Sequence, residues 1–206
     1  MIKNIIWDFD GVILDSMPVR EYGFRKIFEN YDLDLVEKLL QYHNENGGLS
    51  RYVKIRYFYE ELLNQSISNN EIQELAEKFS VIMREELTDK KYLISKTLKF
   101  IETNFRLYNF HIASGSDEVE LQYLCEKLAI SKYFHSINGS PVHKNDLVQR
   151  ILESNKYNIN ETILIGDSIN DYEAAQKNEI SFYGFNNKSL IEHSKIYIED
   201  YEIINE

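Results

Sequence analysis

The pattern of apolar and polar positions divides the chain into two regions. Up to about residue 87, apolar residues recur three and four positions apart, which is the spacing of one face of an α-helix. After residue 88, short apolar runs alternate with helical patterns, an order typical of a parallel sheet covered by helices on both faces. One strand pattern lies apart from the others, because Ile5, Ile6 and Trp7 form an apolar run near residue 1.

The helical region predicts four helices. The first is amphipathic and carries Val19 to Ile27, the second covers 35–43, and the third covers 51–63 with Ser50 as its cap. The fourth begins near residue 68 or 69 and continues to about 87. Glycines in the stretch NENGG at 44–48 end the second helix. An acidic pair, Asp32 and Asp34, precedes that helix, and we interpret it as structural because acids suit a helix start.

The later region predicts the rest of a sheet. The expected helices cover 93–105, 117–128, about 145–152 and 171–176; the apolar runs lie at 110–114, 134–139, 162–168 and 180–185, and the tail holds a short helix or strand. The strand at 3–9 belongs with this sheet, since the helical region offers it no partner. We therefore expect an α/β fold, a doubly wound, Rossmann-like parallel sheet formed by 1–15 and 89–206, with an inserted helical domain at 16–88.

Composition narrows the classes of function. The 206 residues are 43% hydrophobic, as in a folded globular protein, and carry a net charge of −11, which argues against nucleic acid or an anionic membrane as partner. Cys125 is the only cysteine, so neither an intrachain disulfide nor a multi-cysteine metal site is possible. No apolar run approaches the ~20 residues of a membrane span. We expect a cytoplasmic protein, monomeric or dimeric, whose anionic substrate needs local positive charge or a metal.

Polar residues gather where the predicted strands end. The carboxyl ends of strands in a doubly wound sheet line one crevice, so these side chains should converge there. Carboxylates with room for water are a donor set that suits Mg2+, while hydroxyls, turn amides and a lysine suit a phosphoryl group. The residues are Asp8, Asp10, Gly11, Ser114, Gly115, Ser116, Lys144, Asp167 and Asp171.

Each of these pieces alone has a structural interpretation. Ser114-Gly115-Ser116 is a common turn and helix cap, Lys144 taken singly is a surface lysine, and GDSIND from Gly166 is a capped turn. Their shared position at strand ends and their complementary charges favour an active site over these separate interpretations.

The segments DFDGVILDS, ASGS, Lys144 and GDSINDYEAA resemble, in this order, the four motifs of the haloacid dehalogenase superfamily. The insertion at 16–88 resembles the helical cap of that superfamily. The resemblance implies that Asp8 is a nucleophile forming an aspartyl-phosphate, and that Asp10 protonates the leaving oxygen and then activates water. Beside Mg2+ and Lys144, Asp8 should stay ionised, and Asp10 should sample the protonated state that an acid needs.

The resemblance also implies the binding roles. Ser114 and Lys144 would hold phosphoryl oxygens, together with the amides of Gly11 and Gly115. Mg2+ would be bound by Asp8, Asp167 and the backbone carbonyl of Asp10. Asp171 would support the site through water or through Lys144.

The second acid selects a reaction within the superfamily. Dehalogenases lack it and phosphonate-cleaving members carry alanine there, so Asp10 indicates a phosphatase acting on a small phosphorylated metabolite, such as a sugar phosphate or phosphoglycolate. A phosphomutase of the beta-phosphoglucomutase type shares every motif and stays an alternative; a receiver-like domain phosphorylated on aspartate is a more distant one. Arg51 follows the Gly47-Gly48 pair and is the cap residue that we expect to reach the substrate, unless it lies on a solvated helix face.

Overall fold

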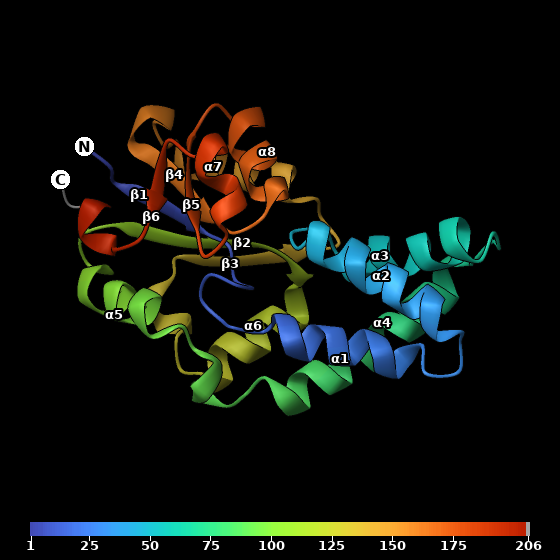
Figure 1. Ribbon diagram of the computed structural model, residues 1–206. Helices are drawn as coiled ribbons and strands as arrows, with labels where there is room; N and C mark the ends of the chain where they lie inside the picture. The colour runs from blue at the N-terminus through green and yellow to red at the C-terminus, as the bar shows by residue number, and fades with distance from the viewer. Residues whose placement is uncertain (205–206) are drawn as a thin grey trace.

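The computed structural model describes residues 1–204 and contains a parallel sheet of six strands (Figure 1). The strands are β1 (Asn4–Trp7), β2 (Asn109–Asp117), β3 (Ser136–Ser140), β4 (Thr162–Gly166), β5 (Ser181–Phe185) and β6 (Ile196–Ile198). Their order in the sheet is β3-β2-β1-β4-β5-β6, and every neighbouring pair is parallel. The first strand thus lies in the middle of the sheet, and the predicted doubly wound α/β fold is confirmed.

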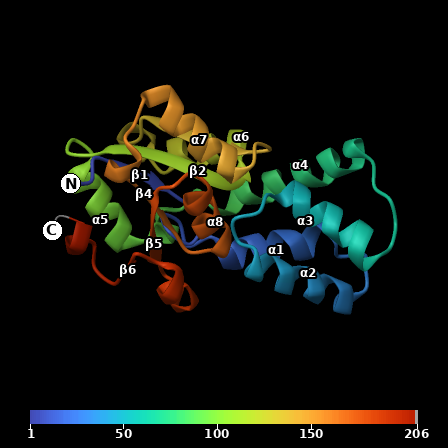
Figure 2. The ribbon, with the colours of Figure 1, turned by 90° about the horizontal axis from the view of Figure 1, so that it is seen from above.

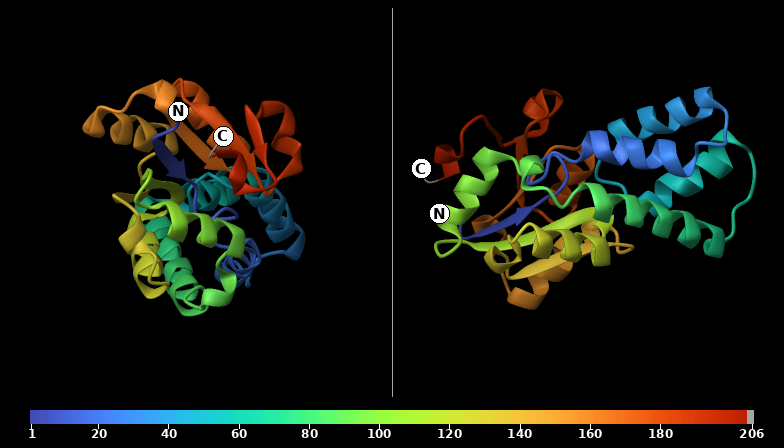
Figure 3. Two further views of the ribbon diagram at one scale, coloured as in Figure 1. Left: turned by 90° about the vertical axis from the view of Figure 1, so that its left-hand side faces the viewer. Right: turned by 90° about the horizontal axis from the view of Figure 1, so that it is seen from below.

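Helices cover both faces of this sheet. The helices α5 (Ser95–Asn104) and α6 (Glu118–Lys127) lie on one face, which Figure 3 (right) views from below, and α7 (Lys144–Asn155) and α8 (Ile169–Lys177) lie on the other. Successive side chains of a strand point to opposite faces. Trp7 accordingly belongs to the apolar cluster that contains residues of α5 and α6, and Ile6 to the cluster that contains residues of α7 and α8. Burial on both faces explains why Ile5, Ile6 and Trp7 of β1 are all apolar.

The observed elements differ from the sequence pattern mainly at their ends. The strand expected at 110–114 runs from 109 to 117, so that its last residues include the serine-glycine-serine turn. The strand expected at 162–168 ends at Gly166, before its aspartate. The tail, expected to hold a helix or a strand, holds both, since β6 is flanked by 3-10 helices at 188–193 and 201–204.

The four helices predicted after the first strand are confirmed, and we call them the cap. They are α1 (Met17–Ile27), α2 (Leu33–Glu45), α3 (Arg51–Tyr57), which continues as a π-helix over 58–62, and α4 (Asn69–Glu86). The expected start signals are present: Ser50 caps α3, Ser68 forms a capping box with Glu71 at α4, and Asp32 caps α2 by accepting a hydrogen bond from the amide of Asp34. In Figure 2 the cap extends to one side of the sheet.

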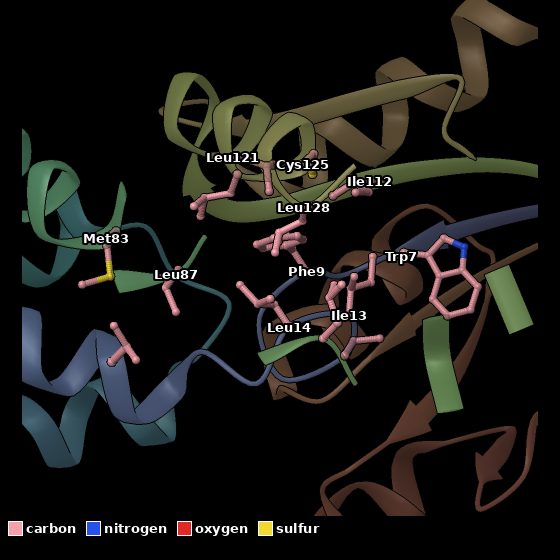
Figure 4. Packing of buried hydrophobic residues seen from close by; sticks show 14 of the residues in the cluster. Trp7, Phe9, Ile13, Leu14, Met83, Leu87, Ile112, Leu121, Cys125 and Leu128 are labelled. Carbon is pink, nitrogen blue, oxygen red and sulfur yellow. The ribbon is translucent and has the colours of Figure 1, made fainter. Parts of the chain in front are cut away.

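The cap and the sheet are joined by two chain segments that pair with each other. Leu14 forms an antiparallel bridge with Leu93, and the amide of Asp15 donates to the carbonyl of Tyr92 at 2.7 Å. Apolar packing also continues across the junction, because Met83 at the end of α4 belongs to the same buried cluster as the residues under the sheet (Figure 4). None of the helices in residues 1–204 is long and apolar enough to cross a membrane.

Candidate active site

The site begins in the turn after β1. The amide of Asp8 continues the sheet pairing by donating to the carbonyl of Ile165 at 2.9 Å. Gly11 then turns the chain with a φ of +74°, a conformation that glycine adopts without a steric cost. A side chain at this glycine would collide with the carboxylate of Asp167. The glycine therefore lets the turn after β1 and the end of β4 approach each other.

The amide of Gly11 has a different partner from the one that the sequence predicts. It donates to the carbonyl of Leu14 at 2.8 Å, closing the turn, and is not free for a phosphoryl oxygen in this arrangement. Gly11 thus contributes through its conformation and its lack of a side chain.

Three of the predicted acids form a tight cluster. Asp8, Asp167 and Asp171 each offer a carboxylate oxygen, and these oxygens lie within 4.8 Å of one another. The ammonium of Lys144 lies 2.8 Å from Asp8 and also donates to Asp171, so one positive charge faces three carboxylates. An excess of negative charge on oxygen ligands is the environment that a hard divalent cation such as Mg2+ prefers, and the residues fit this ion.

The charge excess appears in the pKa values. Burial raises the pKa of Asp8 to about 7, with repulsion from Asp171 adding to it and Lys144 opposing it. Burial and the nearby charge of Asp8 raise the pKa of Asp167 well above its ordinary value. The ammonium of Lys144 loses hydration by burial, yet the two carboxylates beside it raise its pKa. The lysine therefore stays charged, while the carboxylates repel one another unless a cation compensates them.

Asp171 is fixed by the start of α8. Its carboxylate accepts hydrogen bonds from the amide of Ser168 at 3.0 Å and from the hydroxyl of Ser168 at 2.6 Å, as a capping-box acid does. With Lys144 as a further partner, this fully buried side chain has little freedom to turn. The GDSIND segment is thus both a capped turn and part of the acidic cluster.

Asp10 lies outside that cluster and faces the cap. Its carboxylate accepts hydrogen bonds from the hydroxyl of Ser116 at 2.5 Å, from the hydroxyl of Ser16, and from Nε of Arg20 at 2.6 Å. Burial favours the neutral acid, but the Arg20 guanidinium and the two hydroxyls outweigh it and lower the pKa of Asp10.

Without a bound cation, burial and the neighbouring charges raise the pKa of Asp8 and lower that of Asp10. The sequence-based expectation had Asp8 ionised beside Mg2+ and Lys144, and Asp10 able to take a proton. The pKa of Asp8 is raised mainly by burial, with repulsion from Asp171 adding to it, whereas Asp10 differs from the expectation because Arg20 contacts it directly.

Ser114 and Gly115 lie at the end of β2, beside the cap. The buried hydroxyl of Ser114 accepts a hydrogen bond from the amide of Ser116 at 3.1 Å. A side chain at Gly115 would collide with the backbone carbonyl of Gly48, and one at Gly48 would meet Asn170. The glycine loop of the cap thus lies directly against the sheet edge, and the cap is closed over it.

Arg51 is buried, so the interpretation as a solvated helix face is wrong. Its guanidinium lies 2.6 Å from the carboxylate of Glu120 on α6 and 2.5 Å from the hydroxyl of Ser80, and it stacks over the ring of Phe79. Glu120 also pairs with Arg20 at 3.2 Å. One buried carboxylate of the sheet domain therefore holds two arginines of the cap.

Sequence reasoning missed Arg20 and Glu120. Arg20 precedes Gly23 and Phe24 on the buried face of α1, so its helical phase was the available signal. Glu120 follows the N-cap residue Asp117 by three positions, where an acid is ordinarily explained by the helix dipole.

An open cleft leads toward the acidic cluster. It has a volume of about 850 Å3 and lies between the cap helices α1 and α2 and the loops that follow β4 and β5. Asp167 and Gly47 are among its lining residues. The cleft thus connects the outside of the closed molecule with the carboxylates.

Comparison with known proteins agrees with this geometry. The sequence model of the haloacid dehalogenase-like hydrolase family matches residues 5–185. The chain belongs to this family. Among curated proteins, no significant match is found.

Solved structures of similar fold include several haloacid dehalogenase-like proteins. A beta-phosphoglucomutase from Clostridium difficile superposes with a TM-score of 0.79 at 18% identity, covering 100% of this chain and 96% of that one. A predicted phosphoglycolate phosphatase from Haemophilus somnus gives 0.74 at 14%, covering 99% and 96%. CbbY from Rhodobacter sphaeroides, crystallised as a mutant with xylulose-1,5-bisphosphate, gives 0.78 at 13%, covering 97% and 95%. At these identities the likeness concerns the fold.

Proposed function

We propose that this haloacid dehalogenase-like hydrolase is a Mg2+-dependent phosphatase that hydrolyses a small phosphorylated metabolite through an aspartyl-phosphate on Asp8. The observation that carries the proposal is the separation of the two acids after β1. Asp8 lies in the carboxylate cluster with Lys144, whereas Asp10 faces the cap and is bonded to Arg20. This separation supports a role for Asp8 at the phosphoryl group and a role for Asp10 at the group that leaves.

The first step forms a bond between an oxygen of Asp8 and phosphorus, and breaks the bond between phosphorus and the leaving oxygen. Asp10 gives that oxygen its proton, which requires the carboxyl to exchange its contact with Arg20 or Ser16 for the substrate. In the second step a water attacks phosphorus, its proton passes to Asp10, and the bond to Asp8 breaks. The ionised Asp10 favoured by Arg20 is the form needed at this second step.

The binding residues follow from the same geometry. Lys144, already in contact with Asp8, would neutralise a phosphoryl oxygen, and the hydroxyl of Ser114 would donate to another. Asp8, Asp167 and Asp171 would hold Mg2+, with the carbonyl of Asp10 as a further ligand. When bound, the ion supplies charge neutralisation at the phosphoryl oxygens and removes the repulsion among the carboxylates.

A closed cap supports a small substrate. We treat residues 16–88 as the cap domain and 1–15 with 89–206 as the catalytic domain. Gly48 lies against Gly115, which leaves little room for a large leaving group without opening. Sugar phosphates and phosphoglycolate are substrates small enough for this closed arrangement. The proteins of similar fold include a beta-phosphoglucomutase and a predicted phosphoglycolate phosphatase.

A phosphomutase is the second candidate, favoured by the superposition on a beta-phosphoglucomutase. A mutase keeps phosphorylated Asp8 from water, whereas the cleft of about 850 Å3 that reaches Asp167 gives solvent a route to the cluster. We therefore rank hydrolysis first. A receiver-like signalling role is less consistent with a four-helix insertion directly after β1.

The testing experiment is a screen of phosphorylated metabolites for phosphate release, with p-nitrophenyl phosphate as the generic substrate. We expect hydrolysis that depends on Mg2+ and stops with EDTA. The same reactions are analysed for isomerised sugar phosphates, which a mutase forms without stoichiometric release of phosphate. Failure to release phosphate from any substrate with Mg2+ present would contradict the proposal.

A further inference from the structure

A second, much smaller cavity lies between the cap and the edge of the sheet. Its volume is about 20 Å3, room for about one water molecule. The sheet side contributes Asp10, Gly115 and Ser116, and the cap side contributes basic residues. Because Asp10 is the proposed proton donor to the leaving oxygen, this cavity lies on the side of the leaving group. The cap residues that line it are Arg20, Phe24, His43, Gly47, Leu49, Arg51, Lys54 and Phe79.

The buried charges around this cavity do not balance. Three cations, Arg20, Arg51 and Lys54, are at least 95% buried, and they face two carboxylates, Asp10 and Glu120. Both arginines have a carboxylate within 3.2 Å. Lys54 has none among its hydrogen-bond partners in residues 1–204. The unbalanced positive charge is therefore on Lys54.

The partners of Lys54 are neutral. Its ammonium lies 2.8 Å from Nδ1 of His43 and donates to the carbonyl of Gly47 at 3.3 Å. Burial lowers the pKa of Lys54 to about 7, and the charges of Arg20, Lys144 and Arg51 add to this, with Asp10 opposing. Burial and the charge of Lys54 hold the pKa of His43 well below its ordinary value. The imidazole is therefore neutral and can accept a hydrogen bond from the ammonium of Lys54. An ammonium in this position is stabilised by an anion.

Donor groups without a partner surround the same cavity. Nη2 of Arg20, Nη2 of Arg51 and Nε2 of His43 are buried and make no hydrogen bond within the described residues. Buried nitrogens of this kind are ordinarily paired, since an unpaired one costs about 1–3 kcal/mol. An oxygen-rich ligand group that enters here as the cap opens slightly would supply acceptors for them, because the cavity of the closed molecule has room for only about one water.

We propose that Lys54, held by His43, binds a carboxylate on the leaving portion of the substrate, and that this residue determines specificity for phosphorylated acids. The inference rests on the proposed phosphatase function and names the substrate class of the same site. A carboxylate carries one negative charge and matches the one unbalanced cation. A second phosphate group carries nearly two charges and would lie in the same closed cavity as Asp10, beside the buried Glu120.

The test compares substrates that differ in one charge. Phosphoglycolate carries a carboxylate, 2-hydroxyethyl phosphate has a hydroxymethyl group in its place, and 1,2-ethanediol bisphosphate carries a second phosphate. We expect the parent enzyme to have the highest kcat/KM on phosphoglycolate. In Lys54→Met, which keeps a long, unbranched side chain and removes its charge, the ratio of kcat/KM between phosphoglycolate and 2-hydroxyethyl phosphate should fall at least about 30-fold.

Lys78→Met is the matched control, because Lys78 lies exposed on α4 of the same cap. It should leave the ratio as in the parent. Lys54→Gln is a second variant with a polar, uncharged side chain, and its ratio of kcat/KM should fall as in Lys54→Met. Circular dichroism and thermal melting show whether each variant is folded.

Binding to the Asp8→Asn protein separates this inference from the proposed reaction. With Lys54 present, phosphoglycolate should bind more tightly by calorimetry than 2-hydroxyethyl phosphate, and Lys54→Met in the same background should remove the difference. A parent enzyme that hydrolyses no phosphate ester overturns the phosphatase function, while this binding difference still tests Lys54. An unchanged substrate ratio in folded Lys54→Met, or a parent preference for the bisphosphate, overturns the role of Lys54.

Discussion

Nε of Arg20 on the first cap helix lies 2.6 Å from the carboxylate of Asp10 in the turn after β1. The contact crosses from the cap to the sheet domain, and both side chains are buried. Closing the cap and setting the charge of Asp10 are therefore one event, because the guanidinium that lowers the pKa of this carboxyl arrives with α1. Glu120 pairs with the same arginine and fixes its position.

Replacing Arg20 with methionine should move the pH profile. Without the guanidinium, burial raises the pKa of Asp10, so that the proposed base of the second step is protonated at a higher pH and cannot take a proton there. We expect the acidic limb of kcat to shift upward by about one pH unit or more, and kcat at pH 7 to fall. Arg25→Met on the same helix, where the arginine is exposed, is the control. An acidic limb that stays in place would separate Arg20 from Asp10.

Asp8→Asn should abolish turnover and leave the fold intact. Monoester hydrolysis without a catalyst is so slow that enhancements reach ~10²¹, and no neighbouring group would replace the proposed nucleophile. We expect kcat to fall at least about 10⁴-fold. The melting temperature should not decrease, because β1 is held by Ile5, Ile6 and Trp7 and the change removes one of three repelling carboxylates. Residual activity within about tenfold of the parent would exclude Asp8 as the nucleophile.

The fold was predictable because its signals are local. Alternation of short apolar runs with helical patterns gives the parallel sheet, and the acids after Trp7 mark the carboxyl end of the central strand. The strand ends were less predictable. The pattern of Ser114 to Ser116 predicts a turn, yet β2 includes it, since β3 pairs with Ala113 and again with Asp117, with a register irregularity between these two positions.

The cap side of the site was not predictable from motifs. Asp8, Lys144, Asp167 and Asp171 follow strands and converge by the rule of parallel sheets. Arg20 instead depends on how α1 packs against the turn after β1, and Lys54 on how α3 packs against α2. Helical periodicity does not show which buried position of a helix carries a charge.

Removing the divalent cation should make stability fall as the pH rises. Asp8 has a pKa of about 7 in the folded chain and an ordinary value of 3.8 when unfolded, so the folded state binds the extra proton between these values. That stability is present below about pH 4 and is lost as the pH rises to about 7. In EDTA the melting temperature of the protein should therefore decrease as the pH rises from about 4 to about 7, and Mg2+ should reverse the decrease.

Asp167→Asn tests a second carboxylate of the same cluster. The raised pKa of Asp167 lowers the stability of the parent at high pH, as that of Asp8 does. In EDTA near pH 8 the variant should therefore melt at a higher temperature than the parent. Stabilisation by Mg2+ should be reduced, and activity should require at least about tenfold more Mg2+. Saturation at the Mg2+ concentration of the parent would contradict a metal-ligand role for Asp167.

Arg51 and Glu120 should behave as a coupled pair across the interface between cap and sheet domain. Removing one partner of a buried ion pair leaves an uncompensated charge, a loss of ~3–5 kcal/mol in other proteins. Arg20 still contacts Glu120, so we expect the smaller part of that range for Arg51→Met. Glu120→Gln in the same chain removes the carboxylate that Arg51 shares with Arg20, so the loss in the double variant should be smaller than the sum of the two single losses.

The measurement is a double-mutant cycle by denaturant unfolding, with kcat/KM measured in parallel. Arg56→Met is the control, because Arg56 lies on the same helix in an exposed pair with Glu60 and should change stability little. Arg51→Ala should also lower kcat/KM for the physiological substrate at least about tenfold and change hydrolysis of p-nitrophenyl phosphate less. Stability losses that simply add would mean that the two side chains act independently, and an equal activity loss on both substrates would restrict Arg51 to holding the cap closed.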